Sequence, residues 1–283
     1  MANQRFLTGL FGRSIQASRS PRMHEREADA QGLRLIYTLF DFAELGYSER
    51  DLKRLLEAVE LAGFAGINVT HPYKQSILKH LDELSIEAEK IGAANTVAFR
   101  AGRRIGYNTD ASGFEAAFRH SLDDVSSNHV IQIGAGGAGS ATAYALLNLG
   151  VQRLTIHDRD AERSRALIDK MSKHFDPGRV SYCMNVEQSL AEADGVVNAT
   201  PIGMAEYPGM SIPAGCLRKA LWVAEIVYFP LETALLQAAC AKGCRVMDGS
   251  GMAVHQAAGA FEIFTGVPAN AQRMARTFLE FDG

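Results

Sequence analysis

Val130-Ile131-Gln132-Ile133-Gly134-Ala135-Gly136-Gly137-Ala138-Gly139 is the stretch that decides how the second half of this 283-residue chain folds. Its first four residues have the composition of a buried strand, and its glycines have the spacing Gly-x-Gly-x-x-Gly. A helical pattern follows over 140–149, and a strand over 154–157 ends on Asp158, about 20 residues beyond the glycines. This order of elements predicts a Rossmann-type unit that binds a dinucleotide.

The glycines of this turn have separate expected roles. Gly134 permits the tight turn, Gly136 lets the backbone approach the pyrophosphate, and Gly139 allows the helix to pack closely on the strand. Gly137 and Ala138 lie between them. We therefore expect all five residues to contact the cofactor.

Asp158 is the residue expected to select the cofactor. A carboxylate at this strand end accepts hydrogen bonds from both hydroxyls of the adenosine ribose and repels a phosphate at the same place. Arg159 and Arg163 favour the opposite choice, because either guanidinium could bind that phosphate. Asp160 adds a second negative charge, so the local balance predicts NAD, with NADP as the less favoured cofactor.

The rest of the second half continues the alternation that a doubly wound sheet requires. Helices are predicted at 161–174, 187–193 and 232–242, and strands at 180–182, 195–200, 221–228 and 245–248. Two final helices, at 252–266 and 270–281, should pack back on the first half. We predict an α/β protein of two domains: a substrate-binding, catalytic domain over 1–110, completed by 252–283, and a Rossmann domain over 111–251.

The first half also alternates strands with helices. Strands are predicted at 7–12, 34–42 and 63–67, and helices at 22–31 and 48–61, which indicates a mostly parallel sheet. Two further strands, at 94–99 and 105–108, flank Gly102 and predict a hairpin. Asn95 opens this hairpin and Asp110 follows it, so the two ends of the hairpin should lie side by side.

Asn68-Val69-Thr70-His71-Pro72-Tyr73-Lys74 follows the third strand. Pro72 is expected to end that strand and to begin a helix over 73–84, with Lys74 in its first turn. A lysine is unusual there, because the positive end of the helix dipole disfavours a cation. On position alone Lys74 could be a surface residue, and Asp110 could simply cap the helix after it. If the two converge, each supplies the opposite charge that the other needs in a cleft.

Ser18-Arg19-Ser20-Pro21 precedes the first helix. Ser20 is expected to be its N-cap, because Pro21 suits the first helical position. Two hydroxyls spaced by one residue at a helix N-terminus would also form a good cradle for a carboxylate.

Composition excludes several functional classes. The formal net charge is −3, with 47% hydrophobic and 22% charged residues, so the chain lacks the basic footprint of a nucleic-acid-binding protein. No apolar run reaches the roughly 18 residues of a membrane helix, and residues 1–6 lack a signal-peptide core, so we expect a cytoplasmic protein. Its four cysteines and eight histidines show no metal-ligand spacing, so no metal is expected.

Taken together, these motifs resemble the shikimate dehydrogenase family. In the first half the matching segments are Ser18 to Pro21, Asn68 to Lys74, Gly92 to Thr96 and Gly106 to Asp110, and in the second half Gly134 to Gly139, Asn198 to Pro201 and Gly251 to Ala257. They cover nearly the whole chain, in order. The resemblance implies reversible oxidation of a ring hydroxyl of shikimate to a ketone, with a nicotinamide cofactor, in aromatic amino acid biosynthesis or in catabolism.

The resemblance also implies roles for individual residues. Lys74 and Asp110 match the family's catalytic pair, with Lys74 exchanging the hydroxyl proton and Asp110 holding the amine. Matches to the substrate-binding residues are Ser18, Ser20, Thr70, Asn95, Tyr228 and Gln256. Further cofactor-binding residues are expected to be Arg163, Thr200, Val227, Gly249 and Met252.

Two departures from the biosynthetic branch of the family concern the cofactor and the substrate. Asp158-Arg159-Asp160 stands where that branch usually has Asn-Arg-Thr, a signature of NADP. This replacement makes the chain more similar to the NAD-dependent quinate/shikimate dehydrogenases. Members that use quinate often have threonine at the position of Ser20, which leaves quinate as an additional substrate open.

The leading hypothesis is therefore an NAD-dependent shikimate dehydrogenase that functions as a monomer or homodimer. One alternative is the NADP-dependent biosynthetic enzyme, which is favoured if Arg159 or Arg163 faces the ribose. Another is a regulatory homologue that binds the cofactor without turnover, although the presence of both Lys74 and Asp110 argues against it. A third is a family member that acts on an amino analogue of shikimate.

Overall fold

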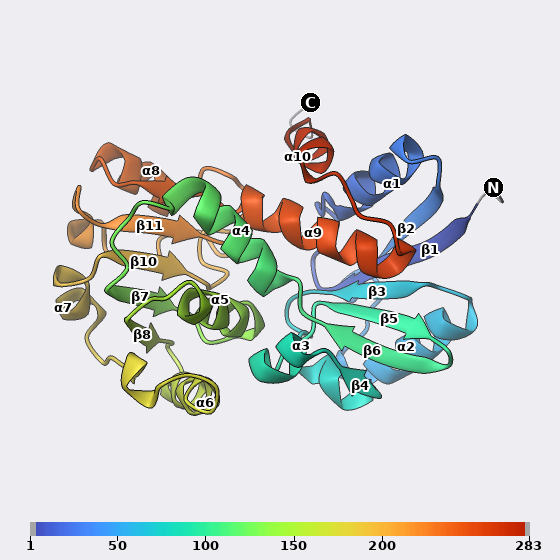
Figure 1. Ribbon diagram of the computed structural model, residues 1–283, viewed down its shortest axis with the longest axis horizontal. Helices are drawn as coiled ribbons and strands as arrows, with labels where there is room; N and C mark the ends of the chain where they lie inside the picture. Colours follow the sequence, from blue (N-terminus) through green and yellow to red (C-terminus); the bar gives the residue numbers. More distant parts are fainter. Residues whose placement is uncertain (1–3, 281–283) are drawn as a thin grey trace. The chain divides into compact units, whose positions relative to one another are not determined.

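The computed structural model describes residues 4–280, and within them the chain forms two compact units. The first unit contains residues 4–109 and 254–280, and the second contains residues 110–253. Figure 1 shows the strands and helices of each unit. The first unit is thus discontinuous in sequence, whereas the second is one stretch of chain.

The second unit contains a six-stranded sheet with the order β12-β11-β10-β7-β8-β9. Its strands are β7 (His129–Ile133), β8 (Arg153–His157), β9 (Val180–Tyr182), β10 (Gly195–Asn198), β11 (Trp222–Glu225) and β12 (Val246–Met247). All the neighbouring strands pair in parallel. The strand order changes direction at β7, where sheets of this kind bind ligands beyond the carboxyl ends of the strands. The predicted doubly wound sheet is confirmed.

Helices pack on both faces of this sheet (Figure 1). They are α4 (Asp110–Leu122), α5 (Gly137–Asn148), α6 (Ala161–Met171), α7 (Val186–Ala191) and α8 (Ala234–Ala241). Ile131 of β7 packs in one hydrophobic core with α7 and α8. The next residue, Gln132, points to the opposite face, where Thr142 of α5 donates a hydrogen bond to its side chain at 2.9 Å.

The first unit contains a mixed six-stranded sheet with the order β2-β1-β3-β5-β6-β4. Its strands are β1 (Arg5–Gly12), β2 (Arg34–Asp41), β3 (Gly66–Val69), β4 (Glu83–Leu84), β5 (Thr96–Arg100) and β6 (Arg103–Tyr107). Three pairings are parallel, and the two that β5 makes are antiparallel. The expected hairpin is therefore present, and Gly102 adopts the positive φ of +73° that its tight turn requires.

The helices of the first unit include the end of the chain. They are α1 (Ser20–Ala30), α2 (Leu52–Leu61), α3 (Ile86–Ile91), α9 (Ser250–Thr265), whose first turn belongs to the second unit, and α10 (Ala271–Leu279). α10 packs beside α1. The C-terminal helices therefore return to the first unit, as the sequence predicts.

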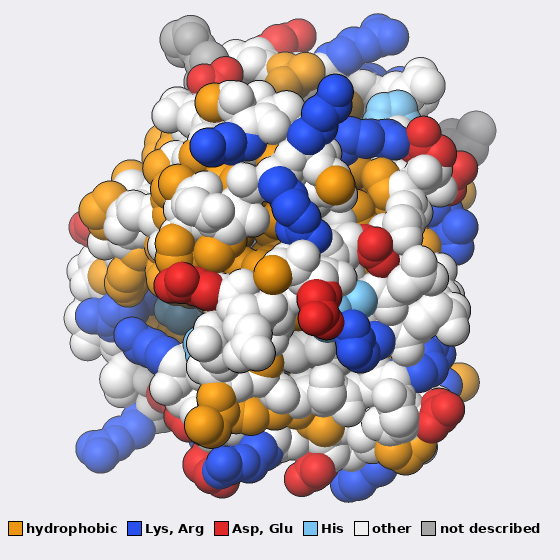
Figure 2. All heavy atoms as spheres, turned by 90° about the vertical axis from the view of Figure 1, so that its left-hand side faces the viewer, with side chains coloured by type: hydrophobic (Ala, Val, Ile, Leu, Met, Phe, Trp, Pro, Cys, Tyr) orange, Lys and Arg blue, Asp and Glu red, His pale blue; other side chains and the backbone are white. Residues whose placement is uncertain are grey.

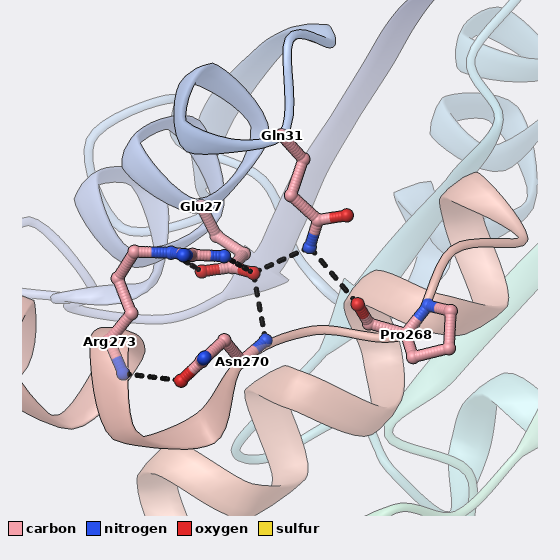
Figure 3. A network of polar contacts seen from close by, with 5 residues as sticks. All are labelled: Glu27, Gln31, Pro268, Asn270 and Arg273. Atoms are coloured by element: carbon pink, nitrogen blue, oxygen red, sulfur yellow. Dashed lines mark hydrogen bonds and ion pairs between the residues drawn. The ribbon is translucent and has the colours of Figure 1, made fainter.

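An ion pair with a buried carboxylate joins α1 to α10 within this unit, as Figure 3 shows. Glu27 of α1 accepts hydrogen bonds from Arg273 of α10 at 2.6 and 2.7 Å, and from the backbone N–H of Asn270 at 2.8 Å. Gln31 donates to Glu27 at 2.6 Å and to the carbonyl of Pro268 at 3.0 Å. Burying a carboxylate without partners is costly, and Glu27 on α1 obtains most of its partners from α10 and the residue before it. The packing of α1 therefore depends on α10.

The helix expected over 73–84 is wrong. The segment forms a turn, a short 3₁₀ helix at Ser76–His80, and then β4. Its polar backbone groups bond to the hairpin region instead, since the Lys74 carbonyl accepts from Ala94 at 2.8 Å and the Asp82 N–H donates to Arg104 at 2.9 Å. Pairing with a distant segment has overridden the local helical signal, so the helix dipole does not act on Lys74.

Candidate active site

Lys74 lies on a loop that the first unit fixes at two points. Thr70, directly after β3, donates its backbone N–H to Phe11 of β1 at 2.9 Å. Four residues later, Lys74 accepts from Ala94, next to Asn95, through its carbonyl. The backbone of Lys74 is thus held beside the segment that carries Asn95, and its side chain is half-buried.

Asn95 is the centre of a buried polar network and is only 2% exposed. Its side-chain oxygen accepts the backbone N–H of Thr109 at 2.9 Å, and its amide nitrogen donates to the Thr109 hydroxyl at 2.9 Å. The same nitrogen lies 3.4 Å from Oε1 of Gln256, a residue of α9. The structure therefore brings together two of the predicted substrate-binding residues, Asn95 and Gln256.

Asp110 follows Thr109 directly and is the first residue of α4. Its side chain is 3% exposed, although acidic side chains are rarely this buried unless they are paired. Asn95 fixes the backbone of the preceding residue, so the path of the chain into Asp110 is set at the end of the hairpin. Asp110 begins the second unit, whereas Lys74 belongs to the first.

Ser18 and Ser20 lie half-buried at the start of α1. Ser20 is the first helical residue and not the N-cap, so that prediction is wrong: Arg19 has the cap position, and the Ser20 N–H donates to the Ser18 hydroxyl at 3.3 Å. Arg19 points away to donate to the carbonyl of Phe278 at 2.8 Å. The Ser18 hydroxyl therefore bonds the backbone at the first residue of α1.

Asp41, which the sequence analysis did not single out, supports the loop before Ser18. Its buried carboxylate accepts the backbone N–H groups of Ser14 at 2.9 Å and Ile15 at 2.8 Å. Burial opposes ionisation, but the N–H groups of Ile15, Ala43 and Ser14 outweigh it and lower the pKa of Asp41. An acidic residue at the end of a predicted strand was the available signal.

The glycine-rich turn of the second unit has the geometry that its spacing predicts. Gly134 has a φ of +106°, and a Cβ there would lie 2.6 Å from the carbonyl oxygen of Ala199. A Cβ at Gly139 would overlap the carbonyl of Gly134, so only glycine permits this approach of helix and strand. At Gly136 the corresponding point has no heavy atom of the described residues within 4 Å, apart from those of Gly136 and its neighbours in the chain. The turn thus leaves open the backbone expected to contact a pyrophosphate, and Gly137 and Ala138 open α5 beside it.

Asp158 follows β8 and is tied to the glycine-rich turn. Its carboxylate accepts from the backbone N–H of Ala135 at 2.8 Å and from that of Asp160 at 3.0 Å. Arg163 forms an ion pair with Asp160, with 3.4 Å between Nε and Oδ2, and Arg159 is exposed. The negative charge is therefore fixed at the strand end, while Arg163 is partly neutralised beside it.

The remaining cofactor candidates lie on loops after β10 and β11. A Cβ at Gly249 would lie 2.5 Å from the carbonyl oxygen of Val227, so these two backbones are in close contact. Thr200 donates its hydroxyl to Asn198 at 2.7 Å. Met252 is buried in the first turn of α9, and Tyr228 is half-buried next to Val227.

Glu225 links these loops and was not predicted as a site residue. It is fully buried and accepts hydrogen bonds from Asn198, Val227 and Thr233. Burial outweighs these bonds and raises the pKa of Glu225 to about 7. The signal was a single acid within an otherwise apolar run from Leu221 to Val227.

Other kinds of site find no support within residues 4–280. No group of three or more histidine, cysteine or acidic side chains there could hold a metal ion. None of the helices that the structure describes is long and apolar enough to cross a membrane. On the face shown in Figure 2, basic and acidic side chains are interspersed, with hydrophobic side chains between them.

Three models of protein families match separate parts of the chain. Residues 10–97 match the model of the shikimate dehydrogenase substrate binding domain, residues 116–204 that of shikimate / quinate 5-dehydrogenase, and residues 249–277 that of the shikimate 5'-dehydrogenase C-terminal domain.

Individual relatives with either cofactor are similar over their full length. Shikimate dehydrogenase (NADP(+)) of Streptomyces avermitilis is 47% identical, covering 100% of this chain and 98% of the relative. Quinate/shikimate dehydrogenase (NAD(+)) of Corynebacterium glutamicum is 45% identical, covering 98% and 99%. The structure of quinate dehydrogenase from Corynebacterium glutamicum in complex with NAD superposes with a TM-score of 0.90 at 44% identity, covering 98% of this chain and 100% of that one. The chain therefore belongs to the shikimate dehydrogenase family.

Proposed function

We propose that this protein catalyses the reversible, NAD-dependent oxidation of shikimate to 3-dehydroshikimate, and that quinate is a possible second substrate. The observation that carries the choice of NAD is Asp158, whose carboxylate is held at the end of β8 by the Ala135 N–H. A fixed negative charge there suits the two ribose hydroxyls of NAD and disfavours the extra phosphate of NADP.

The chemistry requires a hydride and a proton to leave the same secondary alcohol. When bound, the nicotinamide supplies the acceptor for the hydride. In this proposal Lys74 takes the hydroxyl proton as a neutral amine, and Asp110 orients the amine and stabilises the ammonium that forms. In the reverse direction the ammonium donates the proton to the ketone oxygen. Such proton transfer contributes about 100- to 10,000-fold to a rate.

Substrate binding is assigned to the polar groups at the strand ends of the first unit and the start of α1. The hydroxyls of Ser18 and Ser20, two residues apart at the start of α1, are assigned to a carboxylate, and the bond between the Ser18 hydroxyl and the Ser20 N–H supports this assignment. Asn95 and Gln256 are in contact and, with Thr70, are assigned to the ring hydroxyls. Tyr228 is also assigned a contact with the substrate.

The use of NADP is the second candidate, and two observations favour it. The exposed side chain of Arg159 follows Asp158 directly, and the Streptomyces avermitilis relative at 47% identity is named as an NADP enzyme. This reading requires Arg159 or Arg163 to bind the 2'-phosphate in place of its present contacts. It predicts a kcat/KM for NADP at least equal to that for NAD.

Initial rates with shikimate and quinate, each with NAD and NADP, test the proposal in four assays. We expect activity with shikimate and NAD to be the highest. Replacing Asp158 with asparagine should raise the ratio of kcat/KM for NADP to that for NAD about tenfold, the effect of roughly 1.4 kcal/mol of lost repulsion. Asp169→Asn, an exposed change on α6, is the matched control and should leave the ratio unchanged. A wild-type preference for NADP would refute the cofactor assignment.

A further inference from the structure

We propose that Glu225 is a positioning residue that fixes the two loops at the nicotinamide end of the second unit and thereby sets the affinity for the nicotinamide half of the cofactor. The two loops are residues 199–203, after β10, and residues 226–233, after β11. The inference rests on the proposed function, because it requires a nicotinamide cofactor at these strand ends.

The anchor is a contact between the last residues of two adjacent strands. Asn198 ends β10, Glu225 ends β11, and the two are direct partners in the parallel register. The Asn198 amide nitrogen donates to both carboxylate oxygens, at 2.9 and 3.0 Å. Both side chains are 0% exposed, so water does not compete for these bonds.

From this contact the carboxylate reaches the loop after β11 at two points. Oε1 accepts the backbone N–H of Val227 at 3.0 Å, and Oε2 accepts the hydroxyl of Thr233 at 3.2 Å. Thr233 in turn caps α8, because its hydroxyl accepts the N–H of Leu236. Both ends of this loop are therefore bonded to Glu225.

The loop after β10 is held through Asn198. Its amide nitrogen also donates to the carbonyl of Ile202 at 2.9 Å, and its oxygen accepts the hydroxyl of Thr200 at 2.7 Å and the N–H of Thr200 at 3.2 Å. The orientation of the Asn198 amide depends on Glu225, since only an acceptor at that place can receive its N–H groups. One carboxylate thus holds the loop after β11 directly and the loop after β10 through Asn198.

A carboxylate is the side chain that satisfies all these bonds together. When ionised, it offers about four acceptor positions and no donor, and its partners here all donate: an amide, a backbone N–H and a hydroxyl. Glutamine has the same length, but its NH₂ group would face one of these donors. Glu225→Gln should therefore disturb the loops while leaving the packing volume unchanged.

These loops are assigned to the nicotinamide half of the cofactor, because they follow β10 and β11, which lie on the opposite side of β7 from β8. Thr200 and Val227 lie on them, and Val227 contacts Gly249. The groups assigned to the adenosine half, Asp158 and the glycine-rich turn, lie after β8 and β7. A substitution at Glu225 should consequently weaken the binding of the nicotinamide half and leave the binding of the adenosine half nearly unchanged.

The test compares the dissociation constants of NADH and of ADP-ribose, which lacks the nicotinamide, for the wild-type protein and its variants. We expect Glu225→Gln to weaken NADH binding about tenfold and ADP-ribose binding by less than about twofold, as the loss of one or two buried hydrogen bonds implies. Glu225→Asp retains the charge but is one methylene shorter, so its ratio of the two constants should be intermediate. Glu206→Gln, an exposed change just beyond the loop, is the control and should match wild type.

The outcomes separate the two proposals. If both Glu225 variants keep the wild-type ratio, or lose affinity for both ligands equally, the positioning role is wrong. If the wild-type protein binds neither NADH nor NADPH, the proposed function is wrong and the role of Glu225 is refuted with it. If it binds only NADPH, the same ratio is taken with the 2'-phosphorylated pair of ligands, and the cofactor assignment alone is corrected.

Discussion

Each unit has a buried polar network at the end of its strands, and the two networks differ in charge. In the first unit Asn68 and Asn95 link β3 to β5, and the contacts at Asn68 are made by amides and hydroxyls. In the second unit the corresponding link between β10 and β11 contains the carboxylate of Glu225. A neutral network gives geometry that does not change with pH, whereas a buried carboxylate ties geometry to its state of ionisation. These two networks should therefore respond differently to substitution and to pH.

The largest effect is expected at Lys74, where the first unit would carry the proton transfer. Lys74→Ala should lower kcat by about 100- to 10,000-fold with a much smaller change in KM, because the amine acts in the transition state. Steady-state kinetics with shikimate measures this. Lys79→Ala is the control, since Lys79 is exposed and pairs with Glu49 at the surface. A loss of less than tenfold at Lys74 would assign the proton transfer to another group.

The next effect concerns His24, which lies in the core of the first unit against Tyr37, Phe261 and Phe264. Burial lowers the pKa of His24 from 6.5 to about 3, and the nearby Glu27 offsets only part of this. A lowered histidine pKa means that the folded state resists protonation, so stability is lost as the pH falls from 6.5 towards 3. The loss should reach about 4–5 kcal/mol at pH 3.

His24→Leu tests this effect by removing the titrating group. The variant should lack this component, so its free energy of unfolding should rise relative to wild type as the pH falls. Far-UV circular dichroism in urea at pH 7 and pH 4 measures the difference. If the difference in free energy of unfolding between His24→Leu and wild type is the same at pH 7 and pH 4, the folded protein accommodates the charged imidazole.

Glu225 should give the opposite dependence on pH in the second unit. Its folded pKa of about 7 lies above the usual glutamate value of 4.5, so the buried charge reduces stability as the pH rises from 4.5 to 7. The reduction should be about 3 kcal/mol and should be absent in Glu225→Gln. Trp222 is the single tryptophan and belongs to this unit, so its fluorescence reports the unfolding of this unit. If the free energies of unfolding of wild type and Glu225→Gln change with pH in the same way, Glu225 does not carry a buried charge that reduces stability.

The smallest effect is expected from the neutral network. Asn68→Ala removes the acceptor of the Tyr37 hydroxyl and the donor to Thr96, which lie at 2.9 Å in both cases. The loss of these two buried hydrogen bonds should cost about 2 kcal/mol at every pH between 5 and 9. Asn128→Ala, at an exposed position, should be near neutral. A cost that varied with pH would mean that the first network also contains a titrating group.

The sequence predicted most of what depends on local order. The strand, glycine-rich turn and helix around Gly134 are adjacent in the chain, so their spacing determines their geometry. The segment after Lys74 could not be predicted in the same way, because its hydrogen bonds are made with residues that are distant in the sequence. Ala94 donates to the Lys74 carbonyl, and the Arg104 carbonyl accepts from Asp82. Glu225 was missed for a related reason: its partner Asn198 is 27 residues away, and only the register of the sheet makes them neighbours.

The discontinuity of the first unit has a consequence for synthesis on the ribosome. Residues 110–253 form one unit without a gap, so this unit can fold as soon as it emerges. Glu27 and Arg19 are translated before this unit, but their bonds to Arg273 and to the carbonyl of Phe278 can form only after α10 has been synthesised. Residues 4–109 are thus synthesised before the second unit, but their fold is complete only after α10 has left the exit tunnel.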